Sequence, residues 1–286
     1  MRPGTDAWLS ACSVVRTALE DNGYFVARYD QISQEFCDSI VFAMEELFSL
    51  PVETKAQKTS DKPLHGYLGQ FSRLPLFESL GIDDPLTLRG CRKFTHTMWP
   101  EGNDRFCDSI NEYSKELEKI DHMVKKMVFE SYGVDKQRCD SLIESSDYFL
   151  RCMKYRAPQM NENDLGMHCH TDLTIISIVH QLNNLNGLEI KMKDGEWKGV
   201  DASSSLFVVM AGDALNLRDK PIKERVLVFL AFCAVVQPRA FKVHVTEAHA
   251  VQLYTLTAAT PFTTTSYSTS PPETPTRGPR VLDMVM

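Results

Sequence analysis

Two residue types that bind metals stand two positions apart near the middle of the chain, in His170-Thr171-Asp172. On an extended strand, side chains at i and i+2 point to the same side, so an imidazole nitrogen and a carboxylate oxygen can meet at one point. These are two of the three ligands of the 2-His-1-carboxylate facial triad, which holds Fe(II) and leaves the opposite coordination positions open. We therefore predict that His170 and Asp172 are metal ligands.

The same stretch also allows other interpretations. The structural alternative is a buried histidine that is hydrogen-bonded to a nearby carboxylate. His168 points the same way, and we expect it at the rim of the pocket. His168-x-His170-x-Asp172 is similar to the metal motif of binuclear zinc hydrolases, but those enzymes continue with a further histidine where this chain has Leu173. Cys169 has no base or cation beside it that would mark a nucleophile.

The composition is that of an ordinary globular protein, with 286 residues, 43% hydrophobic residues and a net charge of -7. No run of Lys or Arg stands out, so we expect no nucleic-acid partner. The longest apolar run, 226–236, is far shorter than the roughly 20 residues of a membrane helix, so we expect no membrane association. The eight cysteines are scattered and no signal peptide precedes them, which predicts reduced thiols and a cytoplasmic protein. The oligomeric state stays open.

The N-terminal half reads as helical. Apolar residues at helical spacing predict helices over about 7–22 with Asp6 as cap, from Phe36 to Leu47, over about 104–132, and near 136–144. A short strand is expected over 24–29. Residues 52–101 show no clear period, and we expect a long functional loop laid over a scaffold.

From Asp147 onward the pattern changes to short strands, expected over 148–155, around the metal motif, and over 175–180, 188–192, 197–200 and 206–210. Asp194-Gly195 is a strong hairpin turn signal. Helices followed by many short strands favour a helical section that backs a β-barrel or sandwich.

These patterns divide the chain into four parts. We expect an N-terminal helical region over 1–145, a jelly-roll core over 146–216, a divergent segment over 217–257 and a disordered tail over 258–286 rich in Thr, Ser and Pro. We expect residues 217–286 to pack poorly, and the apolar run 226–236 to promote aggregation.

A set of landmarks in unbroken order carries a family resemblance over roughly residues 5–216. They are Asn22-Gly23-Tyr24-Phe25, residues 47–55, 78–84 and 98–103, Met153-Lys154-Tyr155-Arg156-Ala157-Pro158, residues 166–172, Gly187-Leu188-Glu189, residues 194–197 and Gly212-Asp213-Ala214-Leu215-Asn216. The chain resembles the plant 2-oxoglutarate/Fe(II)-dependent dioxygenases, in particular the subgroup that includes enzymes modifying glucosinolate side chains to alkenyl or hydroxyalkyl forms.

The resemblance implies an α+β fold, a double-stranded β-helix (jelly roll) with an N-terminal helical section. It implies Fe(II), 2-oxoglutarate as cosubstrate with ascorbate as a further candidate, and oxidation of a small molecule of plant specialised metabolism. It also places Tyr155 and Arg156 where the family has the strand beside the cosubstrate, so both are candidates for 2-oxoglutarate binding.

The resemblance ends after Asn216. The family expects a second histidine on a later strand and, about ten residues further, an Arg-x-Ser pair whose arginine clamps the far carboxylate of 2-oxoglutarate. This chain has Glu224-Arg225-Val226 where a histidine is expected, and His244, His249 and Arg239 are not in register. Glu224 as a replacement carboxylate is conceivable but unsupported, and we expect His244 and His249 at the surface.

A changed reading frame or a retained intron is one hypothesis for this departure, and it leaves open whether the jelly roll is complete at its C-terminus. The expected function is therefore a 2-oxoglutarate/Fe(II) oxygenase or an inactive member of that class. The alternative is a non-catalytic relative that binds a small molecule or a partner. The hydrolase interpretation ranks last.

Overall fold

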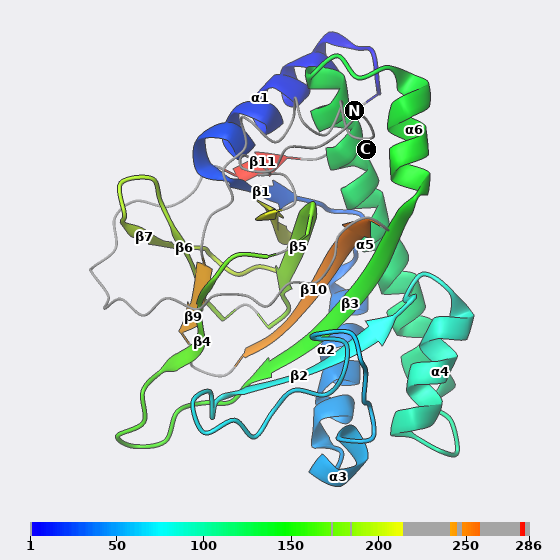
Figure 1. Cartoon of the computed structure of the whole chain (residues 1–286), viewed down its shortest axis with the longest axis vertical. Coiled ribbons are helices and arrows are strands. Elements are labelled where there is room, and N and C mark those ends of the chain that lie inside the picture. Colours follow the sequence, from blue (N-terminus) through cyan, green and yellow to red (C-terminus); the bar gives the residue numbers. More distant parts are fainter. Residues whose placement is uncertain are drawn as a thin grey trace.

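The computed structural model describes residues 2–172, 174–183, 185–213, 241–244, 248–257 and 281–283. Figure 1 shows a large β-sheet with long helices along one side and a smaller sheet facing it on the other side. The described part of the chain thus combines a helical layer with two facing sheets, in agreement with the predicted α+β jelly roll. No helix in the described ranges is long and apolar enough to span a bilayer.

Six helices form in the described part, and the predicted apolar stripes face the core. They are α1 (Asp6–Asn22), α2 (Gln34–Ser49), α3 (Val52–Lys55), α4 (Leu88–Met98), α5 (Asp104–Ser131) and α6 (Lys136–Glu144). The predicted cap of α1 was wrong by one residue: the Thr5 hydroxyl, not Asp6, accepts the Trp8 backbone N–H. Gly23 ends α1 in the left-handed conformation at φ 70°.

The prediction of a long loop over 52–101 was wrong for three elements, the short helix α3, one strand and helix α4. Strand β2 (Phe77–Asp83) pairs with strand β3 (Ser146–Tyr155), and helix α4 packs against α5. Strand β2 was not predicted because it contains Gly81, a residue with low strand propensity. The packing requires glycine there, since a Cβ would lie 2.5 Å from the Phe149 ring. Helix α4 contains Gly90, a residue with low helix propensity, and this weakened the helical pattern. Glycine is needed there because a Cβ would lie 2.3 Å from the Asp84 carbonyl oxygen.

The strands form two sheets. The larger has the order β11-β1-β8-β5-β10-β3-β2 and the smaller has the order β4-β9-β6-β7. Their bounds are β1 (Tyr24–Arg28), β3 (Ser146–Tyr155), β4 (Leu165–His170), β5 (Ile176–Gln181), β6 (Leu188–Lys191), β7 (Trp197–Gly199), β8 (Leu206–Ala211), β9 (Phe241–His244), β10 (Ala248–Thr257) and β11 (Val281–Asp283). All described pairings are antiparallel except that of β1 with β11.

The two faces of the large sheet differ in chemistry because side chains alternate along each strand. On β3, Leu150 and Cys152 join the helix-facing core, whereas Arg151 and Met153 belong to the face turned toward the small sheet. On β10, Val251 and Leu253 likewise join the helix-facing core. The inner face is therefore the one that carries polar side chains into the space between the sheets.

Three strands come from the part of the chain after residue 216. β10 lies between β5 and β3 in the large sheet, and β11 lies beside β1 at its edge. We expected this part of the chain to pack poorly, but Val251 and Leu253 of β10 are fully buried. The apolar run 226–236 and the Thr/Ser/Pro-rich stretch 258–280 lie outside the described residues.

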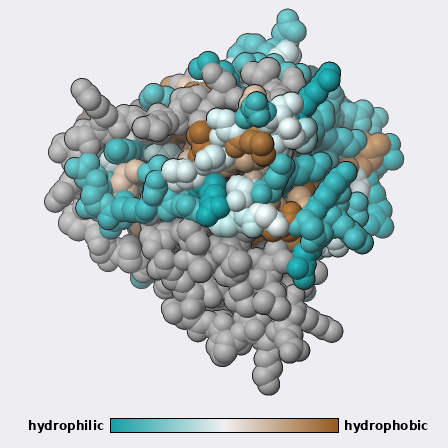
Figure 2. Space-filling model, turned by 90° about the horizontal axis from the view of Figure 1, so that it is seen from above, coloured by the Kyte–Doolittle hydropathy of each residue, from teal (hydrophilic) through white to brown (hydrophobic). Residues whose placement is uncertain are grey.

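The outer surface carries scattered apolar residues. Figure 2, viewed from above, shows a mainly hydrophilic face with small hydrophobic groups. On α1, Leu9 is 50% exposed and Val14 is 41% exposed. Scattered exposures of this kind are normal on a globular protein and indicate no docking surface by themselves.

Candidate active site

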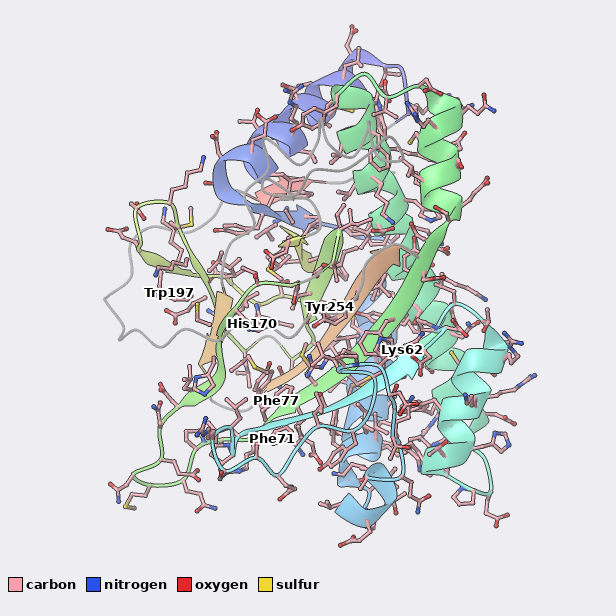
Figure 3. All side chains as sticks on the ribbon, in the orientation of Figure 1. Lys62, Phe71, Phe77, His170, Trp197 and Tyr254 are labelled. Carbon is pink, nitrogen blue, oxygen red and sulfur yellow. The ribbon has the colours of Figure 1, made fainter. Side chains whose placement is uncertain are left out.

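The predicted pair meets at the end of β4, between the two sheets. His170 is the last residue of β4, and Asp172 follows in the connection to β5. The distance from His170 Nε2 to Asp172 Oδ1 is 3.9 Å. This is less than the sum of two metal–ligand bonds of about 2.1 Å each, so one ion can bind both atoms. Figure 3 shows His170 on the small-sheet side, with Phe77 and Tyr254 on strands of the large sheet.

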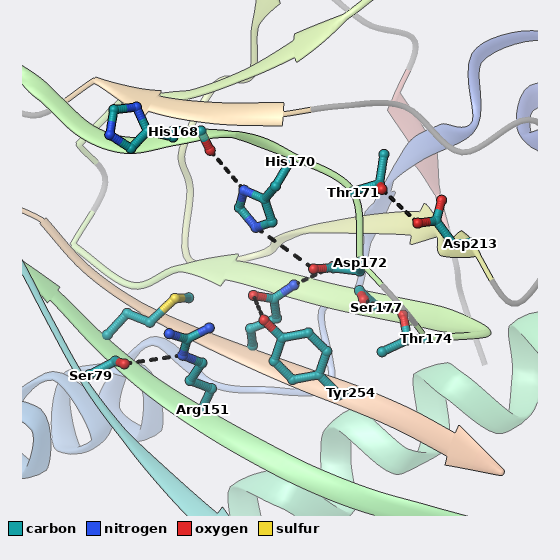
Figure 4. A network of polar contacts seen from close by, with 12 residues as sticks. Ser79, Arg151, His168, His170, Thr171, Asp172, Thr174, Ser177, Asp213 and Tyr254 are labelled. Carbon is teal, nitrogen blue, oxygen red and sulfur yellow. Dashed lines mark hydrogen bonds and ion pairs between the residues drawn. The ribbon is translucent and has the colours of Figure 1, made fainter. Parts of the chain in front are cut away.

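A local hydrogen bond prepares the imidazole for ligation. His170 Nδ1 lies 2.8 Å from the backbone carbonyl oxygen of His168, so Nδ1 carries the proton and donates it. The lone pair is then on Nε2, the nitrogen that faces Asp172. In Figure 4, His170 lies between the His168 ring and Asp172, as expected if His168 sits toward the rim.

The Asp172 carboxylate is oriented by a strand distant in sequence. Gln252 Nε2 on β10 donates to Asp172 Oδ2 over 2.7 Å, and the Tyr254 hydroxyl donates to Gln252 Oε1 over 2.7 Å (Figure 4). These contacts occupy Oδ2 and leave Oδ1 toward His170. Partners of this kind fix ligand orientation around protein metal sites. The sequence analysis missed both residues, although their i, i+2 spacing in an apolar strand was a usable signal.

Burial sets the protonation preferences of the pair. Asp172 is only 7% exposed, and desolvation raises the pKa of its carboxyl group although His170 and Arg151 act in the opposite direction. Desolvation also lowers the pKa of His170, against the influence of Asp172. The imidazole is therefore held neutral, which is the form that binds a metal. A cation at the site would offset the desolvation of the carboxylate.

The connection after β4 is fixed by the end of β8. The Thr171 hydroxyl donates to Asp213 Oδ2 over 2.7 Å, and the Asp213 backbone N–H donates to the Asp172 carbonyl over 2.7 Å. Gly212 is required here, because a Cβ would lie 2.0 Å from the Thr174 carbonyl oxygen. The Gly212-Asp213 landmark thus holds the backbone of Asp172 in place.

Arg151 is a third residue of the site that was not predicted from the sequence. It lies on β3 with 5% of its surface exposed, its Nε donates to the Ser79 hydroxyl over 3.1 Å, and its guanidinium lies 5.2 Å from the Phe77 ring centre. Figure 4 shows the side chain reaching from β3 toward the side on which His170 and Asp172 lie. An arginine in the middle of the apolar stretch Tyr148–Met153 of this strand was the signal that could have identified it.

The two predicted cosubstrate residues differ in their surroundings. Tyr155 is buried on the inner face of β3, where its ring packs 5.4 Å from Phe77 and its hydroxyl lies 3.8 Å from Met153 Sδ. Arg156 is half-buried and forms a bidentate ion pair with Glu162 over 2.7 and 2.8 Å. A ligand carboxylate would have to displace Glu162 to reach Arg156. Both roles stay predictions.

The described residues supply two candidate metal ligands and no third. Among them, no group of three or more His, Cys, Asp or Glu side chains could hold a metal ion. The β4–β9 register pairs Phe241 with His170, and His244 with Leu165 near the far end of the strand. At about 3.3 Å per residue this register puts His244 on the order of 15 Å from His170, which disfavours it as a ligand. Glu224 and Arg239 lie outside the described residues, and His249 pairs with Lys154.

Comparisons with known proteins agree with this geometry. Residues 146–229 match the model of the 2OG-Fe(II) oxygenase superfamily. The probable 2-oxoglutarate-dependent dioxygenase AOP1.2 of Arabidopsis thaliana is 40% identical over 221 residues, covering 75% of this chain and 67% of the relative. The 2-oxoglutarate-dependent dioxygenase AOP3 of the same plant is 29% identical over 311 residues, covering 75% and 74%.

A solved structure confirms the fold. The Arabidopsis thaliana dioxygenase for auxin oxidation 1, in its binary complex with 2-oxoglutarate, superposes with a TM-score of 0.75 at 18% identity, covering 89% of this chain and 91% of that one. At this identity the likeness shows the fold alone, and it confirms the predicted α+β double-stranded β-helix with an N-terminal helical section.

Proposed function

Because the chain belongs to the 2-oxoglutarate- and Fe(II)-dependent oxygenases, we propose that it oxidises a small molecule of plant specialised metabolism, with His170 and Asp172 as two ligands of the iron. The observation that carries the assignment of the ligands is the buried pair of donor atoms, His170 Nε2 and Asp172 Oδ1, 3.9 Å apart. A cytoplasmic location and support by ascorbate belong to the same proposal.

The chain's own residues would bind and orient the reactants. The His168 carbonyl and Gln252 fix the two ligands, so that neither side chain has to reorganise when the ion binds. Bound Fe(II) would supply the oxidation of the substrate, coupled to the conversion of 2-oxoglutarate and O2 into succinate and CO2. The protein supplies a site from which water is largely excluded.

An apolar cluster beside the ligands supports a small organic substrate. Phe77, Met153, Tyr155 and Met167 pack together on the inner face, apart from the main core. Met153 and Tyr155 share the inner face of β3 with Arg151, and Met167 precedes His170 on β4. A pocket with apolar walls and few polar groups is typical of sites for small molecules.

The test is anaerobic binding of Fe(II) and 2-oxoglutarate to the purified full chain, followed by the visible charge-transfer band of the chelate. We expect a band in the natural protein and none in Asp172→Ala, with Asp83→Asn as a control at a carboxylate that pairs with Lys58 outside the candidate site. Absence of the band in a folded, monodisperse natural protein would contradict the proposal.

One observation favours a second candidate, a non-catalytic relative that binds a small molecule. The described residues provide only two of the three expected ligands, and no arginine occurs on β10, the strand that pairs with β3. Succinate formation on addition of O2 distinguishes the candidates, because only an oxygenase releases it. The zinc hydrolase interpretation would require two bound zinc ions and hydrolysis that is independent of 2-oxoglutarate.

A further inference from the structure

The inner face of β10, which contacts Asp172 through Gln252, carries no arginine. The family pattern predicts, some residues after the second histidine, an arginine that clamps the far carboxylate of 2-oxoglutarate. In this chain the inner-face side chains of β10 near the site are Gln252 and Tyr254, and the strand Ala248–Thr257 contains no arginine. A different residue must therefore balance a dicarboxylate bound here.

Arg151 is the charged residue placed next to this position. The register of the sheet pairs Arg151 on β3 directly with Gln252 on β10. Paired residues of adjacent antiparallel strands point to the same face, with Cβ atoms about 5 Å apart. Arg151 is thus a direct neighbour of the glutamine that holds Asp172. Its positive charge also acts on His170 and Asp172, lowering the pKa of each, although burial is the larger influence on both groups.

Arg151 differs from the other buried cations in the described part of the chain. Lys55 lies 2.6 Å from the Glu78 carboxylate, and Lys125 lies 2.8 Å from the Asp121 carboxylate. Arg151, at 5% exposure, forms no ion pair within the described ranges. A buried charge normally has a partner of opposite sign, because desolvation without one is costly. The guanidinium therefore has the character of a group that awaits an anionic ligand.

The contacts of Arg151 are all with uncharged groups. Ser79 accepts from Nε over 3.1 Å, the Tyr254 hydroxyl shares a hydrogen bond with the guanidinium, and Phe77 packs against one of its faces. The remaining N–H groups of the guanidinium can donate to a carboxylate, the anion whose geometry an arginine matches best. The Tyr254 hydroxyl, which also donates to Gln252, is a further polar group on the same face.

We propose that Arg151 anchors the far carboxylate of 2-oxoglutarate from strand β3, in place of the arginine that the family pattern expects after the second histidine. This inference rests on the proposed function, since it assumes that the 2-oxo acid binds at His170 and Asp172. It assigns to the inner face of β3 the role of recognising the cosubstrate.

Paired ligands and paired variants test the proposal. 2-Oxoglutarate and 2-oxopentanoate share the 2-oxo acid end and the chain length, but only the first has a second carboxylate. We would measure the affinity of both for the full, Fe(II)-loaded chain by anaerobic calorimetry, in the natural chain, Arg151→Met and Arg105→Met. Arg105 is the matched control, because it is an exposed arginine on α5 that pairs with Glu46.

We expect the natural chain to prefer 2-oxoglutarate over 2-oxopentanoate, and Arg151→Met to reduce this preference by about 10- to 100-fold, the range for a hydrogen-bonded charge pair. Arg151→Lys should retain part of the preference, because lysine keeps the positive charge but lacks the planar pair of N–H donors of arginine. Arg105→Met should leave the preference unchanged. Thermal unfolding of each variant checks that the sheet is intact.

Three results would overturn the inference. An unchanged preference in Arg151→Met contradicts it and leaves the proposed function intact. An equal loss for both ligands means that Arg151 only supports the fold around the site. Failure of the natural, folded chain to bind either 2-oxo acid in the presence of Fe(II) contradicts the proposed function itself, and the inference with it.

Discussion

Two histidine–aspartate pairs in this molecule show how the same residue types can serve opposite purposes. His65 Nδ1 contacts Asp83 Oδ1 directly, and Lys58 Nζ lies 2.9 Å from Asp83 Oδ2. His170 and Asp172, in contrast, keep their facing atoms 3.9 Å apart, and the second Asp172 oxygen is held by the neutral amide of Gln252. In the first pair the aspartate already has a cationic partner within the protein, Lys58. In the second pair the two facing atoms are far enough apart for an added cation to bind between them.

The electrostatics of the two aspartates follow from this difference. Burial tends to raise the pKa of Asp83, but the hydrogen bonds from His65 and Lys58 outweigh it and hold that pKa well below its usual range. For Asp172 burial prevails and the pKa is raised. A low pKa marks a carboxylate whose charge is already balanced within the protein. A raised pKa marks one for which the cost of burial exceeds the compensation by its neighbours, here His170, Ser177 and Arg151.

Aromatic rings lie between the two pairs, so both pairs share one packed environment and can be compared directly. The Phe149 ring lies 3.9 Å from the His65 ring and 5.6 Å from the Tyr254 ring. Tyr254 in turn donates to Gln252, which holds Asp172. Substitutions in one pair are therefore made in the same packed environment as those in the other.

The largest expected effect is on metal binding. We expect His170→Gln to weaken Fe(II) binding by more than about 100-fold, since loss of a ligand exceeds the 10- to 100-fold effect of an outer-shell change. His65→Gln should reduce thermal stability but leave Fe(II) affinity within about threefold. Anaerobic Fe(II) titration of both variants measures the contrast. Similar losses in the two variants would show that the pairs are not functionally distinct.

An intermediate effect is expected for the amide that orients Asp172. Gln252→Leu removes the donor to Asp172 Oδ2 and should lower Fe(II) affinity by about 10- to 100-fold. Tyr254→Phe removes only the hydroxyl that donates to Gln252, so its effect on Fe(II) affinity should be smaller. Competition with a chelator of known affinity gives both values. The prediction fails if the tyrosine variant is the weaker binder.

The smallest effect is expected for the His65–Asp83 pair, on the free energy of unfolding and its dependence on pH. Asp83→Asn should lower the free energy of unfolding by about 1 kcal/mol at pH 7, because a partly exposed ion pair contributes little. The pKa of Asp83 is lower in the folded state, so its stabilising contribution is present above the unfolded pKa near 3.8 and lost as the pH falls through the folded value. Urea unfolding of both proteins at pH 7 and pH 3 measures this. If the difference in unfolding free energy between the natural protein and Asp83→Asn were larger at pH 3 than at pH 7, a lowered pKa of Asp83 in the folded state would be contradicted.

The sequence alone determined the features that depend on neighbouring residues. The i, i+2 spacing of His170 and Asp172 brings their side chains to one side in an extended segment, and the structure holds them 3.9 Å apart. The stripe along α5 predicted its buried face, since the helical period is fixed by the backbone hydrogen bonds. Asp194-Gly195 predicted the β6–β7 hairpin, where Gly195 adopts φ 91°.

The tertiary structure decided everything that depends on register between distant strands. Only the pairing of β3 with β10 places Arg151 opposite Gln252, and only the fold brings Gln252 to Asp172. Likewise β2 and α4 were invisible because Gly81 and Gly90 serve close packing against other elements rather than local propensity. Sequence periodicity records which face of an element is buried. It does not record which other element covers that face, because that choice is made by long-range packing.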